Sequence, residues 1–141
     1  MKLRFKAISE NEAFARITIS AFIASLNPTL EEIADVKTAV SEAVTNVVIH
    51  AYRGKTGKVR IECSVRGKEM TVTVIDYGVG IENIEKAMEP LYTTRPELDR
   101  SGMGFAFMEA FMDKLEVESE PGQGTTVRMK KKFGIGQSPF A

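Results

Sequence analysis

The sequence predicts an α+β domain in which two helices precede most of the strands. Between residues 30 and 51, apolar residues recur every three or four positions, which is the period of an amphipathic helix. Over residues 59–74 they alternate with polar residues, as in a hairpin with one buried face, and residues 115–132 predict a second hairpin. The chain of 141 residues is 43% apolar and 27% charged, which suits a single globular domain. We expect this domain to span residues 1–135, with a loose tail over 136–141.

The first half of the chain is expected to hold one strand and two helices. The chain begins with alternating apolar and polar residues, which predicts a short strand. Ser9, with Glu12 three residues later, matches a capping box and predicts the start of a helix. A second capping box, Thr29 with Glu32, predicts the start of the next helix. The expected buried stripe of this second helix consists of Ile33, Val36, Val40, Val44, Val47 and Ala51.

The second half is expected to hold two hairpins separated by a long loop and a short helix. Residues 58–76 predict the first hairpin, with its turn at Gly67. Prolines and glycines interrupt residues 81–103, so this segment is expected to be a long, partly ordered loop. Residues 105–114 predict a short helix, which leads into the closing hairpin over 115–132.

Composition narrows the class of function. Lys plus Arg and Asp plus Glu both number 19, so no net positive charge attracts nucleic acid, and direct nucleic-acid binding is not expected. The single cysteine, Cys63, excludes an internal disulfide and fits a reducing cytoplasm. No apolar run reaches the roughly 18–20 residues that a membrane span needs, and the N-terminus lacks the apolar region of a signal peptide. We therefore expect a cytoplasmic protein that does not interact with a membrane.

Three polar residues in the stretch SEAVTNVVIHA, residues 41–51, are spaced four apart on the second helix. They are Glu42, Asn46 and His50, and each lies roughly 40° further round the helix axis than the one before. Glu42 and Asn46, with Asp35, lie opposite the buried stripe, so they are either the solvated side of the helix or part of a site. The pattern alone favours the solvated side. His50 lies nearer the buried side, where a histidine is more often packed than a ligand.

Two glycine-containing segments are further candidates for a site. Asp76 directly follows an apolar strand and precedes Gly78 and Gly80, which allows either a tight turn or space for a planar ligand. Gly102 and Gly104 precede the expected short helix, where free backbone N–H groups could bind a phosphate or could simply join a loop to a helix. Each of these signals is weak by itself.

The candidate motifs follow one another in a particular order. They are SEAVTNVVIHAY on a helix, IDYGVGI after a strand, PLYTTRPELDRSGMGFAFME in the loop, and GTTVRM, which alone could be only a hairpin turn. In this order, over roughly residues 30–130, they resemble the Bergerat ATP-binding fold of the GHKL group, which includes gyrase-type ATPases, Hsp90, histidine kinases and MutL. Within the group, the sequences of these motifs are most similar to those of the anti-sigma factor serine kinases. The resemblance implies a two-layer α/β sandwich whose mixed, mostly antiparallel sheet is covered on one face by helices.

The resemblance also implies roles for individual residues. Glu42 would be the general base that accepts the proton of the attacking hydroxyl. Asn46 would bind the Mg²⁺ that bridges the phosphates of ATP or ADP. Asp76 would accept a hydrogen bond from the adenine amino group, whereas His50 receives no role. The other residues implied to bind the nucleotide, some of them in a lid over residues 81–101, are Gly78, Gly80, Thr94, Arg100, Gly102, Met103, Gly104, Phe105 and Thr126.

The implied partners are proteins. The resemblance implies a homodimer that binds and inhibits an RNA polymerase sigma factor, phosphorylates a serine on an anti-anti-sigma factor, and so controls sporulation transcription. Glu12 and Arg16, four residues apart, are either a surface ion pair or a docking contact for such a partner.

Two other functions stay open at this point. One is a histidine-kinase-type catalytic domain that acts on a separate phosphoacceptor, and the other is a nucleotide-gated binding module without transfer activity.

Overall fold

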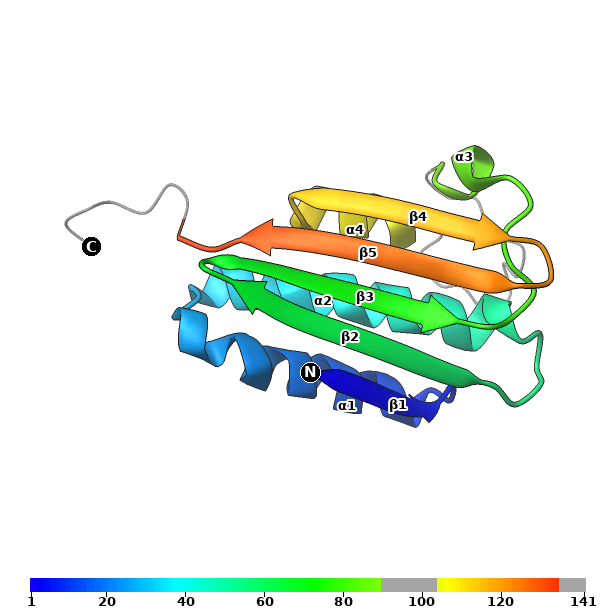
Figure 1. The fold of residues 1–141 in the computed structure, drawn as a ribbon, viewed down its shortest axis with the longest axis horizontal. Helices are drawn as coiled ribbons and strands as arrows, with labels where there is room; N and C mark the ends of the chain where they lie inside the picture. The colour runs from blue at the N-terminus through cyan, green and yellow to red at the C-terminus, as the bar shows by residue number, and fades with distance from the viewer. Residues whose placement is uncertain (90–103, 135–141) are drawn as a thin grey trace.

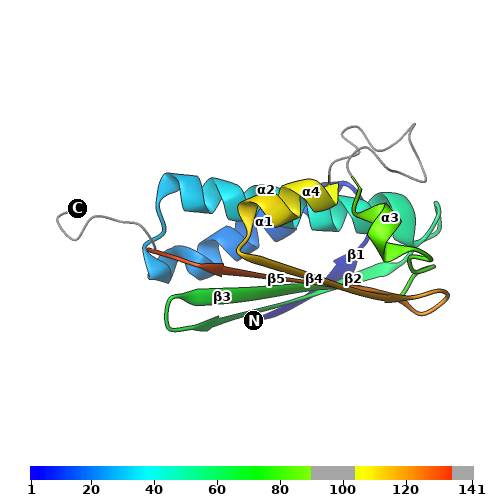
Figure 2. The same ribbon diagram turned by 90° about the horizontal axis from the view of Figure 1, so that it is seen from above.

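The protein is a two-layer α+β sandwich, with one sheet and a layer of helices on one face of it (Figures 1 and 2). The structure is a computed structural model that describes residues 1–89 and 104–134. The sheet order is β1-β2-β3-β5-β4, and every pair of neighbouring strands in the described residues is antiparallel. The predicted fold class is therefore confirmed, although the sheet is antiparallel throughout rather than mixed. The strands are β1 (Lys2–Lys6), β2 (Lys58–Arg66), β3 (Glu69–Asp76), β4 (Lys114–Glu120) and β5 (Gly124–Lys132).

The helices lie together above one face of the sheet, and Figure 2 shows the opposite face left open. Within the described residues, no helix combines the length and apolar character needed to cross a membrane. A short helix, α3, lies within the segment that was expected to be a partly ordered loop. The helical elements are α1 (Glu10–Ile23), the 3₁₀ turn η1 (Ala24–Leu26), α2 (Leu30–Asn46), the π-helical turn η2 (Val47–Ala51), α3 (Ile84–Ala87) and α4 (Gly104–Phe111).

One of the two predicted capping boxes is confirmed and the other is wrong. At the start of α2, the Glu32 backbone N–H donates to Thr29 Oγ1 at 3.0 Å, and the Thr29 N–H donates to Glu32 Oε1 at 2.9 Å. At the start of α1, Ser9 has helical dihedral angles and its side chain makes no capping bond, so it cannot act as an N-cap. Glu12 instead pairs with Arg16, with 3.4 Å between Oε1 and Nε.

The core lies between α1, α2, α4 and the inner face of the sheet. Val36, Val40 and Val44 of the predicted stripe are fully buried, whereas Ile33, near the start of α2, is only half-buried. Burial of each such side chain contributes about 1.5–3 kcal/mol. The buried apolar side chains of β2, β3 and β5 occupy alternate positions, as the two-residue period predicts; they include Val59, Ile61, Cys63, Met70, Val72, Val74, Val127 and Met129.

Candidate functional site

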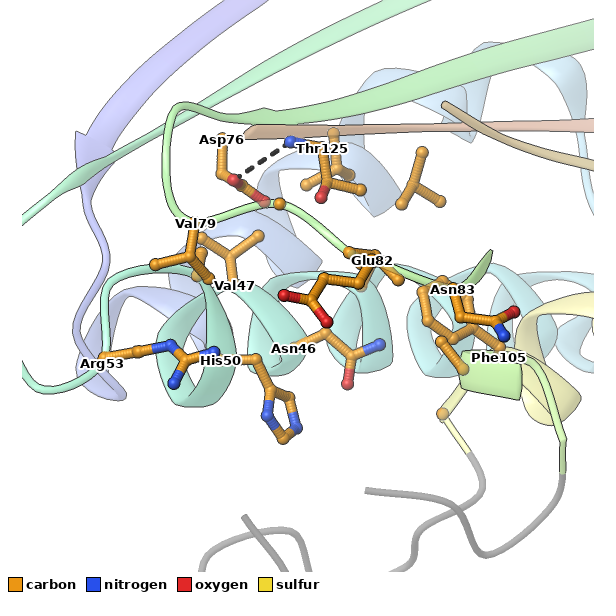
Figure 3. A pocket seen from close by; sticks show the side chains of 18 of the residues that line it. Asn46, Val47, His50, Arg53, Asp76, Val79, Glu82, Asn83, Phe105 and Thr125 are labelled. Carbon is orange, nitrogen blue, oxygen red and sulfur yellow. Dashed lines mark hydrogen bonds between the residues drawn. The ribbon is translucent and has the colours of Figure 1, made fainter. Parts of the chain in front are cut away.

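A cavity of about 390 Å³ opens where η2, the turn after β3, α3 and the start of α4 meet (Figure 3). This volume lies within the range of small-molecule sites, about 300–1,000 Å³. Figure 3 shows Asp76 and Thr125 on the sheet side of the cavity and Asn46 and His50 on the helix side. Residues from both halves of the sequence therefore line one space.

Asp76 is a buried carboxylate in the wall of this cavity, with 6% of its surface exposed. Its Oδ1 accepts hydrogen bonds from the Gly78 N–H at 3.0 Å and the Thr125 N–H at 3.2 Å. Oδ2 has no hydrogen-bond partner in the part of the chain that the structure describes. Burial raises the pKa of Asp76, and the two N–H donors partly oppose that rise. The residue is thus held by one oxygen while the other can accept a bond from a ligand.

Gly78 and Gly80 meet protein backbone, not open space. A Cβ at Gly78 would lie 2.0 Å from the Ala51 carbonyl oxygen, and the neighbouring Val79 N–H donates to that same oxygen at 2.8 Å. Gly80 has a φ of +76°, and a Cβ there would lie 2.3 Å from the Glu120 carbonyl oxygen. Of the two, only Gly80 lines the cavity. These glycines let the Asp76 turn pack against η2 and the β4–β5 hairpin, which fixes the position of the carboxylate.

The structure brings Glu42, Asn46 and Gly104 together. A Cβ added to Gly104 would lie 3.1 Å from Asn46 Oδ1, 3.2 Å from Asn46 Nδ2 and 3.3 Å from Glu42 Oε2. The first residue of α4 therefore lies directly against the polar side of α2, and both Glu42 and Asn46 are half-buried. The side of α2 that the pattern alone assigned to solvent is covered by another helix. Phe105, the next residue of α4, lines the cavity with Asn46 and Gly104.

The π-helical turn changes the position expected for His50. Helix α2 ends at Asn46, and Val47–Ala51 continues with the wider winding of a π-helix. Such turns occur often at functional sites. His50 is half-buried and lines the cavity, and Figure 3 shows it on the same side of the helix as Asn46. The position expected for His50 is that of an ideal α-helix, whereas the wider turn places His50 on the side of the cavity.

One predicted residue is displaced by a single position. Thr126 is not among the residues that line the cavity, whereas its neighbour Thr125 is. Adjacent residues of a strand point to opposite faces of the sheet, so Thr126 points to the open face and Thr125 to the helix side. Thr125 Oγ1 lies 2.8 Å from Ser119 Oγ, and Thr125 is 9% exposed. The structure thus places Thr125, and not Thr126, in the lining of the cavity.

Several lining residues had no signal in the sequence that would single them out. Arg53 lines the cavity from a left-handed backbone conformation with a φ of 48°, next to Gly54. Glu82, Asn83 and Lys86 reach it from α3 and the segment that precedes it. The helical pattern around residues 84–87 is too short to be recognised, since one turn does not define a period. Four predicted residues, Thr94, Arg100, Gly102 and Met103, lie outside the described residues.

Glu12 and Arg16 are placed on α1 and are not among the residues that line the cavity. They form the i,i+4 ion pair described above, and their side chains are 21% and 40% exposed. Two apolar residues of α1, Phe14 and Ile17, are 53% and 61% exposed. At about 100° per residue, they lie roughly 100–160° round the helix axis from the ion pair.

The few oxygen donors of the site fit a magnesium ion whose remaining ligands are phosphate and water. Among residues 1–89 and 104–134, no group of three or more His, Cys, Asp or Glu side chains could hold a metal ion. The Asn46 amide oxygen and the Glu42 carboxylate nevertheless lie within reach of the same point, the position of a Gly104 Cβ. Mg²⁺ commonly takes one or two protein oxygens and completes its shell with phosphate and water. A site with one or two oxygen donors is compatible with that habit.

Comparison with known families and proteins gives a consistent picture. The model of the histidine kinase-like ATPase domain matches residues 5–131. The chain is 62% identical to the anti-sigma F factor of Clostridium acetobutylicum over 135 residues, which cover 96% of this chain and 94% of the relative. It is 60% identical to the anti-sigma F factor of Clostridium beijerinckii over 96% of this chain and 95% of the relative. With the corresponding protein of Thermoanaerobacter pseudethanolicus the identity is 59%, over 95% and 94%.

Two solved structures share the fold. The RsbU and RsbW domains of a Mycobacterium tuberculosis protein match with a TM-score of 0.67 and 20% identity, over 94% of this chain and 32% of that one. The catalytic domain of the histidine kinase ThkA matches with a TM-score of 0.56 and 16% identity, over 94% of this chain and 96% of that one. At these identities the likeness concerns the fold alone.

Proposed function

Because this chain belongs to the family of anti-sigma F factors, which carry a histidine kinase-like ATPase domain, we propose that it uses ATP to phosphorylate a serine of an anti-anti-sigma factor. Nucleotide binding and a kinase-like ATPase domain come with the family. The finer assignments are part of the proposal: serine as the acceptor, a sigma factor of the sigma F type as the inhibited partner, and control of sporulation transcription.

The observation that carries the proposal is the meeting of Glu42, Asn46 and Gly104 at the edge of a cavity of about 390 Å³. A carboxylate, an amide oxygen and the first residue of a helix there are the groups that phosphoryl transfer needs: a base, a hard oxygen ligand and a backbone N–H aimed at an anion. Neither a packed core nor a solvated helix face requires this combination. The site is therefore assigned to the phosphates of the nucleotide.

The other end of the cavity is assigned to the base of the nucleotide. Asp76 Oδ2 would accept a hydrogen bond from the exocyclic amino group of adenine, since Oδ1 already holds two backbone N–H groups. Guanine presents a carbonyl oxygen at the corresponding position and would meet the carboxylate unfavourably. Val79 and Ala51 contribute apolar surface near this end of the cavity. This arrangement favours ATP and ADP over guanine nucleotides.

Within the proposal, transfer proceeds by attack of a serine hydroxyl on the γ-phosphorus of ATP. The bond between the serine oxygen and phosphorus forms, the bond from phosphorus to the β,γ-bridging oxygen breaks, and ADP leaves. The hydroxyl proton passes to the Glu42 carboxylate. Asn46 would hold Mg²⁺, which would neutralise charge on the phosphates when bound. The backbone N–H groups at the start of α4 would orient the phosphates.

Replacement of Glu42 tests the assignment of the base. Glu42→Ala should abolish transfer of radioactive phosphate from ATP to the anti-anti-sigma factor while nucleotide affinity and sigma-factor binding survive. The expected loss is about 10²–10⁴-fold, the usual contribution of a general base. Unchanged phosphorylation by the variant would contradict the proposal. Lys37→Ala, on α2 but absent from the cavity lining, is a matched control that should transfer at the normal rate.

The same assay separates the alternative functions. A histidine-kinase-type domain would produce an acid-labile phosphoramidate, whereas phosphoserine survives acid and is released by alkali. A binding module without transfer chemistry would label neither protein, yet would still retain the sigma factor in the presence of ATP. The proposal expects an acid-stable label on the anti-anti-sigma factor.

The partner surface and the homodimer belong to the proposal as well. Glu12 and Arg16 are assigned to partner docking, because this partly exposed ion pair lies on α1, a helix that also exposes the apolar residues Phe14 and Ile17. Protein interfaces typically combine apolar residues with charged residues at the rim. Arg16→Ala should weaken retention of the sigma factor without a change in ATP affinity, and equal retention would contradict this assignment. Sedimentation equilibrium of the purified protein tests the homodimer.

A further inference from the structure

A buried lysine connects three elements on the far side of α4 from the cavity. Lys131 lies on the inner face of β5, and its side chain is only 11% exposed. Its Nζ donates to the Phe111 carbonyl oxygen at 2.8 Å, and it lies 3.6 Å from Asp35 Oδ2. Phe111 is the last residue of α4, and Asp35 belongs to α2. One ammonium group therefore joins β5, the C-terminal end of α4 and the polar side of α2.

Burial of the Lys131 side chain is energetically unfavourable, so compensating interactions are needed. An ammonium group taken out of water loses several kcal/mol of hydration, which partners must offset. A methionine or leucine at this position would pack against the same helices at no such cost. The Phe111 carbonyl, which lies at the negative end of a helix, and the Asp35 carboxylate are suitable partners. Such a group ties elements in a fixed relation, which apolar packing alone does not.

The C-terminal end of α4 is held to β5 by two further bonds. The Asp113 N–H donates to the Lys130 carbonyl oxygen at 2.8 Å, and Asp113 Oδ2 accepts from the Lys132 N–H at 2.6 Å. Both join the α4–β4 junction to strand β5. Of these three polar contacts within residues 1–89 and 104–134, only the Lys131 ammonium also reaches α2, through Asp35. It thus adds a polar connection between α4 and the helix that carries Glu42 and Asn46.

The spacing of these contacts matches along the two helices. Gly104 lies against Glu42 and Asn46, and Phe111 lies near Asp35 through Lys131, so α4 runs antiparallel to α2. From Gly104 to Phe111 is seven residues, and from Asp35 to Glu42 is also seven, or about 10 Å of helix in each case. The helix pair is therefore fixed at two points, one at each end of α4. The point at Lys131 is structural, and the point at Gly104 belongs to the site.

We propose that Lys131 is a positioning residue of the phosphoryl-transfer site, which holds α4 against α2 through Asp35 and Phe111 and thereby places Gly104 beside Glu42 and Asn46. The inference rests on the proposed function, because it assigns the Gly104 end of α4 to the phosphates. Without the ammonium, α4 keeps its buried Met108 and its bonds to β5 but can tilt about its C-terminal end. A tilt displaces the end that lies at the site. Misplacement by about 1 Å can cost 10²-fold in rate.

Lys131→Met tests the proposal, with Lys130→Met as the matched control. Lys130 carries the same side chain on the same strand, but it points to the open face of the sheet, where Lys131 points inward. In the full chain, Lys131→Met should lower kcat for transfer to the anti-anti-sigma factor by about tenfold or more, with a much smaller change in the KM for ATP. Lys130→Met should stay within about twofold of the unchanged protein.

A second measurement does not depend on transfer. Backbone amides of residues 104–108 in Lys131→Met should exchange with solvent faster than in the unchanged protein. The resonances of the Gly104 backbone amide and the Asn46 side-chain amide should shift. If the unchanged protein transfers no phosphate, the proposed function fails, yet these resonances still decide whether Lys131 positions α4. Asp35→Asn, which keeps the Phe111 bond and removes only the charge on α2, should give the same effects more weakly. If Lys131→Met does not fold, Asp35→Asn replaces it as the test of the proposal.

A merely structural lysine gives a different result. Ile19→Val, on the buried face of α1, is a control that lowers Tm at a residue that does not line the cavity. If Lys131→Met lowers Tm in the same way while kcat, amide exchange of residues 104–108 and the Gly104 resonance stay unchanged, the proposal is overturned. A fall in kcat together with the shifted resonances, in Lys131→Met but not in Lys130→Met or Ile19→Val, supports it.

Discussion

Gly104→Ala is the substitution whose effect the structure defines most closely. The added Cβ would lie 3.1–3.3 Å from side-chain atoms of Asn46 and Glu42, whereas an ordinary carbon contact is about 3.5–4.0 Å. Relief of the contact requires Asn46 and Glu42 to retreat by about 0.4 Å. A displacement of about 1 Å can cost 10²-fold in rate, so a displacement of about 0.4 Å should cost a little under half of that on a logarithmic scale. We therefore expect transfer to fall about tenfold, or about 1.4 kcal/mol of activation free energy.

The same change should leave the fold intact. Gly104 is helical and has no positive φ, so alanine adopts its backbone conformation without strain. Alanine is favoured over glycine inside a helix by about 0.5–1 kcal/mol, which offsets the crowding of the two side chains. Thermal unfolding should therefore show the same or a slightly higher Tm. The informative assay is the transfer rate under saturating ATP, measured beside the melting curve.

Ala110→Gly is the converse control. Ala110 is exposed on the same short helix, so its replacement by glycine should lower the free energy of unfolding by about 0.5–1 kcal/mol without a change at the site. Transfer and stability should thus change independently in the two variants. Gly104→Ala with a normal rate would refute the reasoning, because the crowding of Asn46 and Glu42 would then have no consequence for the chemistry.

Four further predictions follow from two buried titratable groups, Asp76 and Cys63. Asp76→Asn should fold with a free energy of unfolding within about 1 kcal/mol of the unchanged protein, because its amide oxygen can still accept from the Gly78 and Thr125 N–H groups. Calorimetry should nevertheless show a loss of ATP affinity, since the amide then presents its NH₂ to the cavity and repels the adenine amino group. Burial raises the pKa of Asp76, so ATP affinity should weaken as the pH falls toward that value, sooner than for an ordinary carboxyl near pH 3.9. The free energy of unfolding should depend on pH in the opposite direction. The contribution of Asp76 is fully present at acid pH and is lost as the pH rises through its raised pKa. The stability of Asp76→Asn relative to the unchanged protein should therefore increase with pH, and a pH-independent difference would contradict this. Burial raises the pKa of Cys63 to about 11, so iodoacetamide should modify it at pH 8 only after denaturation, and rapid labelling of the native protein would contradict its burial.

Most of the secondary structure could be predicted because it depends on local spacing. The capping box of Thr29 and Glu32 joins residues three apart, and the buried stripe of α2 repeats within one helix. The hairpins follow from alternation and a turn at Gly67, which has a φ of +62°. The failed cap at Ser9 has a local cause of another kind, since Ser9 itself has helical dihedral angles instead of the extended ones of an N-cap. Patterns of residue type do not report that angle.

The site was predicted in its motifs but not in its packing. Glu42, Asn46, Asp76 and Gly104 were identified from the order of short motifs, and the structure places all four at or beside one cavity. The exchange of Thr126 for Thr125 reflects a choice of strand face, which depends on the strand pairing. For such choices a motif identifies the segment but not the side chain.

The polar stripe of SEAVTNVVIHA, the acidic residue at the end of a strand and the glycines at the start of a helix can all be predicted from the sequence, because each depends on residue type and short spacing. Three features appear only in the folded chain: α4 covers that stripe, a π-helical turn brings His50 to the cavity, and Lys131 joins α4 to α2. The physical reason is that these contacts join residues far apart in the chain. Their geometry is set by the packing of α2, α4 and β5 around a common core, which no local pattern records.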